Sequence, residues 1–266
     1  MNNTIIKNTI WETYKYLKSE KDIFVKQNPL IKNFWLSNKK MVKNIITRSK
    51  NNEEIDTYVT LCPFYSDWWI RWDYSSFENL PNRYQNKLNS ALDIIDFLWN
   101  YFSMNIKFLL SDLWIMIMDP NFDRSNFTKI IDDTICIYKN RLIEKLWSWN
   151  FSLSTFSEEW IKLDSICDCS ELNIKTKEDI YIILQEYWIN SDKFKFSLDV
   201  IIKSFWITWA YYLVKNYLEE NKQLIERYDD SIFVNVEVCS PLNSLYTVWK
   251  YKLNATNLFA KVDINS

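Results

Sequence analysis

Three acidic side chains, Asp67, Asp112 and Glu237, lie at or just beyond the ends of segments that have the composition of buried β-strands. In open parallel sheets, ligands bind beyond the carboxyl ends of the strands. A carboxylate in that place can bind a ribose hydroxyl group, an amine or a metal ion. We therefore take these three residues as candidate catalytic residues. The structural alternatives are a cap or a solvated turn for Asp112 and the exposed face of an edge strand for Glu237.

The composition is abnormal in two residue types, because the chain has 14 tryptophans and no glycine. Average usage predicts about 19 glycines in a chain of this length. Glycine supplies the positive φ angles that tight turns and helix ends require. We infer that most of the tryptophans stand where glycine belongs, as happens when UGA codons for glycine are translated as tryptophan. The alternative is a chain with 14 genuine tryptophans; Trp11 and Trp160 are the best candidates for genuine ones.

Four tryptophans lie where a helix needs a left-handed cap. Trp35, Trp147, Trp188 and Trp206 each follow a segment with helical periodicity, and all but Trp147 precede an apolar residue. A left-handed glycine followed by an apolar residue that packs back on the last turn is the Schellman motif. The sequence therefore predicts helix ends at these four positions.

A tryptophan-rich loop follows Asp67. If its three tryptophans stand for glycines, the loop offers bare backbone amides that, with Arg71, can hold a phosphate or a carboxylate. Taken literally, the same tryptophans form a stacking platform for sugars or bases, and a purely structural turn is the third interpretation. The candidate substrate-binding or anion-binding residues are Trp68, Trp69, Arg71, Trp72 and Asp73.

The absence of histidine narrows the possible chemistry. It excludes catalytic triads built on histidine, histidine general bases and histidine metal ligands. The pair Cys167 and Cys169 has neither zinc-site nor redox spacing, and no second pair completes it. No metal site is therefore predicted, and the sequence leaves the cofactor undetermined.

Charge and cysteine usage indicate the partners and the location. With a net charge of −2 and a pI near 5.5, the chain has no excess of positive charge for binding nucleic acid, so no nucleic acid partner is expected. Five cysteines, an odd number, and an N-terminus without the apolar core of a signal peptide predict a reduced, cytoplasmic protein. No apolar run is long enough to span a membrane. A small-molecule ligand is the expected partner, and the oligomeric state stays open.

Strand and helix patterns alternate along the chain. Segment 57–62 is rich in β-branched and aromatic residues, 82–98 has helical spacing of apolar residues, and 106–111 is a second apolar run. These three segments predict a β-α-β unit, whose right-handed crossover makes its strands parallel. Further strands are expected over 231–238 and 258–264.

Helices are expected over much of the remaining chain, and 156–164 is ambiguous. The fold class is α/β, with a Rossmann-like, mostly parallel sheet flanked by helices. Residues 1–50 are expected to form an N-terminal helical extension and 51–266 a single compact domain. The expected helices are 4–19, 28–48 with a break at Trp35, 124–146, 176–187 and 197–226 with a break near Trp206.

A partial resemblance covers about residues 80–119. The pair Leu80-Pro81, a helix, then Ser111-Asp112 and Asp119 resembles the motif order of the isonitrile synthase family. Those enzymes convert the amine of an amino acid, using a sugar phosphate, on a Rossmann-like fold. Asn82 stands where the family has an acidic residue, and the family's basic and histidine-containing motifs have no counterpart here. The resemblance implies a Rossmann-like fold and an amino-acid substrate.

These features together predict a cytoplasmic enzyme that acts on a small anionic or amino-acid-like substrate, as a transferase. Asp112 and Glu237 would orient the substrate, and Arg71 with the amides of loop 67–73 would bind an anion. The alternative is a non-catalytic module that binds a nucleotide, a metabolite or a protein partner through the same crevice.

Overall fold

The computed structural model gives the arrangement of most of the chain. The described residues are 9–28, 30–36, 39–61, 76–112, 127–146, 150–159, 173–204, 206–227, 231–237 and 256–262.

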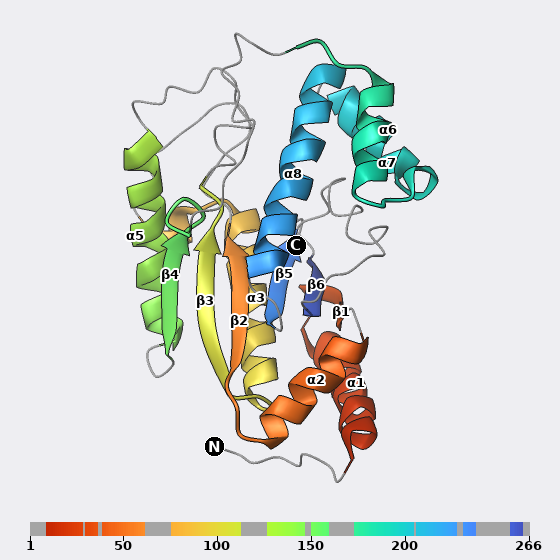
Figure 1. The fold of residues 1–266 in the computed structure, drawn as a ribbon. Coiled ribbons are helices and arrows are strands. Elements are labelled where there is room, and N and C mark those ends of the chain that lie inside the picture. Colours follow the sequence, from red (N-terminus) through yellow and green to blue (C-terminus); the bar gives the residue numbers. More distant parts are fainter. Residues whose placement is uncertain are drawn as a thin grey trace.

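Six strands form one sheet, in the order β1-β6-β5-β2-β3-β4 (Figure 1). Strands β2 to β6 are parallel to one another, and β1, at the edge of the sheet, pairs antiparallel with β6. The parallel strands follow the Rossmann order, which reverses between β2 and β5, and such reversal points are where ligands bind. The strands are β1 (Ile31–Leu36), β2 (Ile55–Leu61), β3 (Met104–Leu110), β4 (Phe151–Thr155), β5 (Ile232–Glu237) and β6 (Thr256–Val262).

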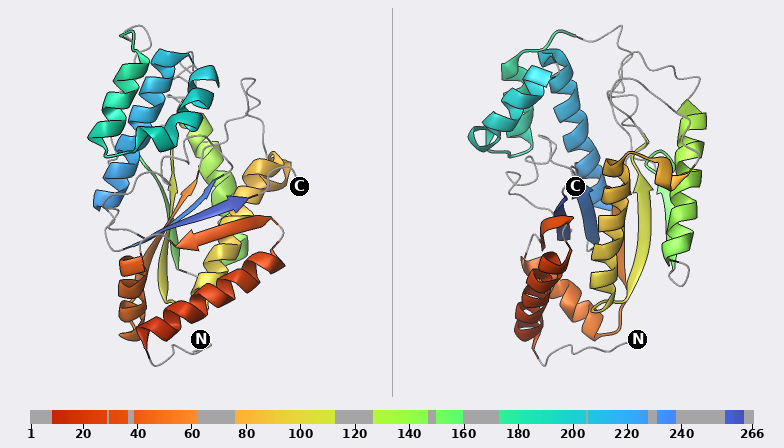
Figure 2. Two further views of the ribbon diagram at one scale, coloured as in Figure 1. Left: turned by 90° about the vertical axis from the view of Figure 1, so that its right-hand side faces the viewer. Right: turned by 180° about the vertical axis from the view of Figure 1, so that it is seen from behind.

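Helices cover both faces of this sheet. Helices α3 and α5 lie on one face and α8 on the other, while α6, α7 and the start of α8 stand beyond the carboxyl ends of the strands (Figures 1 and 2). No described helix is both long and apolar enough to cross a membrane. The helices are α1 (Ile10–Gln27), α2 (Lys39–Lys50), the short η1 (Phe77–Asn79), α3 (Asn82–Trp99), α5 (Phe127–Leu146), α6 (Lys177–Glu186), α7 (Ser191–Ser204) and α8 (Ile207–Arg227).

Each face of the sheet has its own apolar core. On one face, Val59, Ile106 and Phe108 are fully buried in a core with α3 and α5. On the other face, Leu109 and the partly buried Tyr58 pack with the helices α6 to α8. This two-sided burial explains why the last three residues of β3, Phe108 to Leu110, are all apolar and buried, as expected of a strand in the interior of a parallel sheet.

The predicted β-α-β unit is confirmed, because β2, α3 and β3 fall on the three expected segments and β2 pairs parallel with β3. Two strands were missed. Segment 28–48 is not one broken helix, since Ile31–Leu36 forms β1 and Trp35 pairs with Phe259 instead of capping a helix. Strand β4 lies just before the segment that the sequence left ambiguous. Both missed strands are short and lie at the edges of the sheet.

Trp188 occupies the left-handed cap that its sequence predicts. Its φ is 57°, its N–H donates to the Gln185 carbonyl at 2.9 Å, and the N–H of Ile189 donates to the Leu184 carbonyl at 2.8 Å. Those two bonds define the Schellman motif, and Ile189 is buried in the same core as Leu184. The indole itself is 75% exposed. A glycine in the gene at this position stays a prediction.

Two other tryptophans at predicted helix ends, Trp206 and Trp147, are not seen in the predicted left-handed cap. Trp206 precedes α8, and its carbonyl accepts the N–H of Ala210 at 2.9 Å, so it is the N-cap of α8. Trp147 lies outside the described residues. Trp99 follows segment 82–98, and its place there also predicts a cap; it is instead the last residue of α3 and packs partly buried against the core.

We predict that Trp188→Gly stabilises the protein by about 1 kcal/mol. The left-handed conformation costs an L-residue roughly 1–2 kcal/mol, and the greater freedom of glycine in the unfolded chain offsets part of that gain. Urea unfolding measures the difference. Trp99→Gly is the matched control and should destabilise the protein by about 1 kcal/mol or more, because glycine is a poor helix former. A Trp188→Gly variant less stable than the parent would contradict the cap assignment.

Candidate functional site

The carboxyl ends of β3 and β5 carry two of the candidate residues. Asp112 follows the end of β3 by two residues, and Glu237 is the last residue of β5. Strand β2 lies between these strands, so the two residues share one edge of the sheet on strands about 10 Å apart. The side chain of Glu237 lies outside the described part, so convergence of the two carboxylates stays a prediction.

The remaining candidates fall in the loop between β2 and η1, outside the described residues. The anion site and the stacking platform therefore stay predictions. These residues are Asp67, Trp68, Trp69, Arg71, Trp72 and Asp73.

Asp112 is a buried carboxylate rather than part of a solvated turn. It is 2% exposed, and its Oδ1 accepts the backbone N–H of Ser157 at 3.2 Å. Its own N–H donates to the Leu110 carbonyl at 2.9 Å, which closes a three-residue turn immediately after β3. Because burying a polar group is costly unless it is hydrogen-bonded, the contact with Ser157 offsets part of the cost of burying this side chain.

Ser157 belongs to a tight turn that follows β4. The Thr155 N–H donates to Glu158 Oε2 at 2.7 Å, and the Glu158 N–H donates to Thr155 Oγ1 at 3.1 Å. This reciprocal pair is a capping box, which organises the start of a helical turn. The sequence carries the signal, a threonine with a glutamate three residues later, at the start of the segment left ambiguous.

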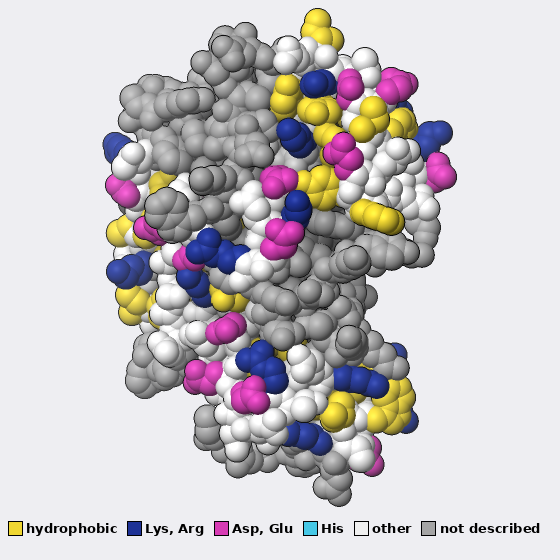
Figure 3. All heavy atoms as spheres, viewed as in Figure 1, with side chains coloured by type: hydrophobic (Ala, Val, Ile, Leu, Met, Phe, Trp, Pro, Cys, Tyr) yellow, Lys and Arg dark blue, Asp and Glu magenta, His cyan; other side chains and the backbone are white. Residues whose placement is uncertain are grey.

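Glu159 anchors the same turn from the other face of the sheet. Its Oε1 is paired with Lys107 of β3 and accepts a hydrogen bond from Ser154 at 3.0 Å, and its Oε2 lies 3.6 Å from Arg227 Nη2 at the end of α8. Acidic and basic side chains gather over β2 to β4 on this face (Figure 3). With 14% of its side chain exposed, Glu159 links α8 to the turn that holds Asp112. Sequence analysis missed this cluster because its members come from distant segments.

Tyr58 lies on β2 beside this cluster, in register with Lys107. Burial raises the pKa of Tyr58 to about 12, with further increases from the negative charges of Asp56 and Glu159 and a decrease from Arg227. The phenol is therefore neutral at ordinary pH and is not a candidate base.

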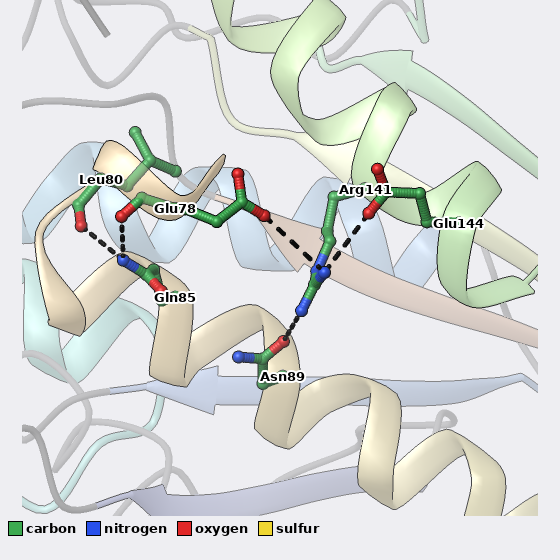
Figure 4. A network of polar contacts seen from close by, with 6 residues as sticks. All are labelled: Glu78, Leu80, Gln85, Asn89, Arg141 and Glu144. Atoms are coloured by element: carbon green, nitrogen blue, oxygen red, sulfur yellow. Dashed lines mark hydrogen bonds and ion pairs between the residues drawn. The ribbon is translucent and has the colours of Figure 1, made fainter. Parts of the chain in front are cut away.

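Arg141 of α5 fixes the segment around η1, which follows the candidate loop (Figure 4). Its guanidinium donates to Asn89 Oδ1 of α3 at 3.4 Å and lies 3.3 Å from Glu144 and 3.9 Å from Glu78 of η1. It also lies over the Phe77 ring, 4.8 Å from the ring centre. One side chain thus joins α3, α5 and η1.

Gln85 holds the same region from within α3. Its Nε2 donates to the carbonyls of Glu78 at 3.0 Å and Leu80 at 2.7 Å (Figure 4). The start of α3 is therefore fixed to the residues that precede it.

No protein-family model and no curated protein matches the chain. Solved structures do match. A mitochondrial tyrosyl-tRNA synthetase from Coccidioides posadasii matches with a TM-score of 0.51 and 12% identity, over 94% of this chain and 71% of its own. This similarity confirms the α/β Rossmann-like fold and shows the fold alone.

Two further structures match less closely. One is a tyrosyl-tRNA synthetase from Archaeoglobus fulgidus complexed with L-tyrosine, with a TM-score of 0.48 and 10% identity, over 85% of this chain and 59% of its own. The other is a cyclodipeptide synthetase of Mycobacterium tuberculosis, with a TM-score of 0.44 and 8% identity, over 86% of this chain and 93% of its own. The resemblance to isonitrile synthases stays a prediction.

We predict that Tyr58 ionises near pH 12, as measured by the phenolate absorbance lost in Tyr58→Phe. The pKa of Tyr58 is higher in the folded protein than in the unfolded chain. The contribution of the neutral phenol to the free energy of unfolding is therefore complete below the ordinary tyrosine pKa and is lost as the pH rises toward 12. Glu159→Gln should lower the pH at which Tyr58 is half-ionised, because the change removes a nearby negative charge. Glu53→Gln, in an exposed pair with Arg48, should leave it unchanged. A Tyr58 that titrates like an exposed tyrosine would contradict this description.

Arg141→Ala should lower the free energy of unfolding by about 1–3 kcal/mol, because it removes charged hydrogen bonds and a cation–ring contact at a junction of three elements. Chemical denaturation gives the value. Arg48→Ala is the control, since an exposed ion pair contributes about 1 kcal/mol or less. Equal losses in the two variants would show that Arg141 has no special structural role.

Proposed function

We propose that the protein is an enzyme that acts as a transferase on a small anionic or amino-acid-like substrate, bound at the carboxyl edge of the sheet. The observation that carries the proposal is the Asp112 carboxylate, 2% exposed and held by the Ser157 N–H just beyond β3. Asp112 orients the substrate by accepting hydrogen bonds from it.

The location of Asp112 supports this role. Ligands of Rossmann-like folds bind beyond the carboxyl ends of the strands, near the point where the strand order reverses. That point lies between β2 and β5, and Asp112 follows β3, the other neighbour of β2. Helices α6 and α7 and the start of α8 stand beyond the same edge, where they can contribute to a binding site (Figure 1).

The substrate class follows from the chemistry of a carboxylate. An ionised carboxylate only accepts hydrogen bonds, and its strongest partners are cations such as an ammonium group. The similar synthetase from Coccidioides posadasii is named for tyrosine, which is consistent with an amino-acid-like substrate here. Because the chain has no histidine, the general base must be another group, and the candidate catalytic residues are Asp67, Asp112 and Glu237.

Calorimetric titration with the standard L-amino acids, nucleotides and sugar phosphates tests the proposal. The parent protein should bind a member of one class, and Asp112→Asn should bind it at least tenfold more weakly, because an uncharged amide replaces a charged acceptor of similar shape. Turnover of the bound compound distinguishes an enzyme from the alternative, a non-catalytic binding module.

Asp56→Asn is the matched control for Asp112→Asn. Asp56 also accepts a hydrogen bond, from Asn105 at 3.0 Å, but it lies at the amino end of β2. Its replacement should leave the affinity unchanged. A parent protein that binds none of these compounds, or an Asp112→Asn variant that binds as tightly as the parent, would refute the proposal.

A further inference from the structure

The hydroxyl group of Ser111 lies beside Asp112 and is buried without a partner. Ser111 is 4% exposed, and its Oγ has no hydrogen-bond partner in the described part of the chain. Its backbone is well fixed, because the Ser111 N–H donates to the Leu61 carbonyl of β2 at 2.8 Å. A buried hydroxyl left unpaired costs about 1–3 kcal/mol, and native proteins keep few such groups.

The location of Ser111 distinguishes it from the other buried polar atoms that lack a partner. Three such atoms belong to Asn86 and Ser90 of α3 and Arg141 of α5, all within helices. Ser111 alone of the four follows a parallel strand at the edge where ligands of this fold bind. The unpaired hydroxyl is thus adjacent in sequence to the carboxylate of the candidate site.

The local backbone allows Ser111 and Asp112 to act together. In a continuing strand, neighbouring side chains point to opposite faces. Here the Asp112 N–H donates to the Leu110 carbonyl, so Ser111 is the central residue of a three-residue turn. Because the strand has ended, the rule that neighbouring side chains point to opposite faces no longer applies to Ser111 and Asp112. A carboxylate and a hydroxyl oxygen on adjacent residues are both acceptors, which suits a group with several N–H donors.

We infer that Ser111 is a substrate-binding residue, whose Oγ accepts a hydrogen bond from the ammonium group that Asp112 binds. This inference rests on the proposed function and assigns the amino group of the substrate to this pair of residues. Within the described part of the chain the hydroxyl has no partner, and in the inferred complex the substrate supplies one.

This role has a thermodynamic signature that a structural serine lacks. Ser111→Ala removes a buried group that is unpaired in the free protein, so the melting temperature should stay equal or rise. The same change removes a hydrogen bond from the complex, so the affinity should fall. A serine held by an internal water would instead lose stability when it is replaced, because the water would lose a partner.

The test combines melting temperatures of the free proteins with calorimetric titration of the standard L-amino acids. The amino acid that binds the parent most tightly is then titrated into each variant, beside its analogue that lacks the amino group. Ser111→Ala should weaken amino-acid binding roughly five- to tenfold, which corresponds to one hydrogen bond. It should leave the binding of the analogue unchanged.

Ser90→Ala is the matched control, since Ser90 is also a buried serine with an unpaired hydroxyl, but lies in α3. It should keep or raise the melting temperature and leave the affinity unchanged. A Ser111→Ala variant that melts lower than the parent, or binds the amino acid as tightly, would overturn the inference and leave the proposed function standing. If no amino acid binds the parent, the amino-acid form of the proposed function fails, and this inference fails with it.

Discussion

The parallel pairing of β2 with both β3 and β5 is the constraint on which the rest of the fold depends. Tyr58 is in register with Lys107 on one side and Phe233 on the other. Because β2 has a parallel neighbour on each side, β3 to β6 point the same way and their carboxyl ends lie at one edge. Burial of both faces then requires helices on each, which α3, α5 and α8 provide.

Charged groups near that edge are buried only where other groups pair with them. Asp112 accepts the Ser157 amide, and Glu159 is bound by Lys107 and by Arg227 at the end of α8. These contacts join the end of β3, the turn after β4 and the last turn of α8 into one unit. The Ser111 hydroxyl is buried beside Asp112 with no partner among the described residues, and such a local inconsistency is expected at a binding site.

Sequence periodicity predicted the central elements because each has a strong local signal. The β2-α3-β3 unit and the capping box of α6 at Thr176 are examples. Strand β1 was missed because its short apolar run also fits a helix, and its pairing with β6 joins segments far apart in the chain. The cap at Trp188 was predicted because a segment with helical periodicity precedes it and the apolar Ile189 follows it. The contacts of Glu159 come from three segments and left no pattern in the sequence.

The central claim is that the carboxyl edge of the sheet at Asp112 binds the substrate. A crystal structure of the protein with the tightest-binding amino acid tests it most directly. The proposal predicts the ammonium group within hydrogen-bond distance of Asp112 and the rest of the ligand beyond the ends of β2 and β5. A ligand bound elsewhere, with Asp112 contacting only the Ser157 amide and other protein groups, would contradict it.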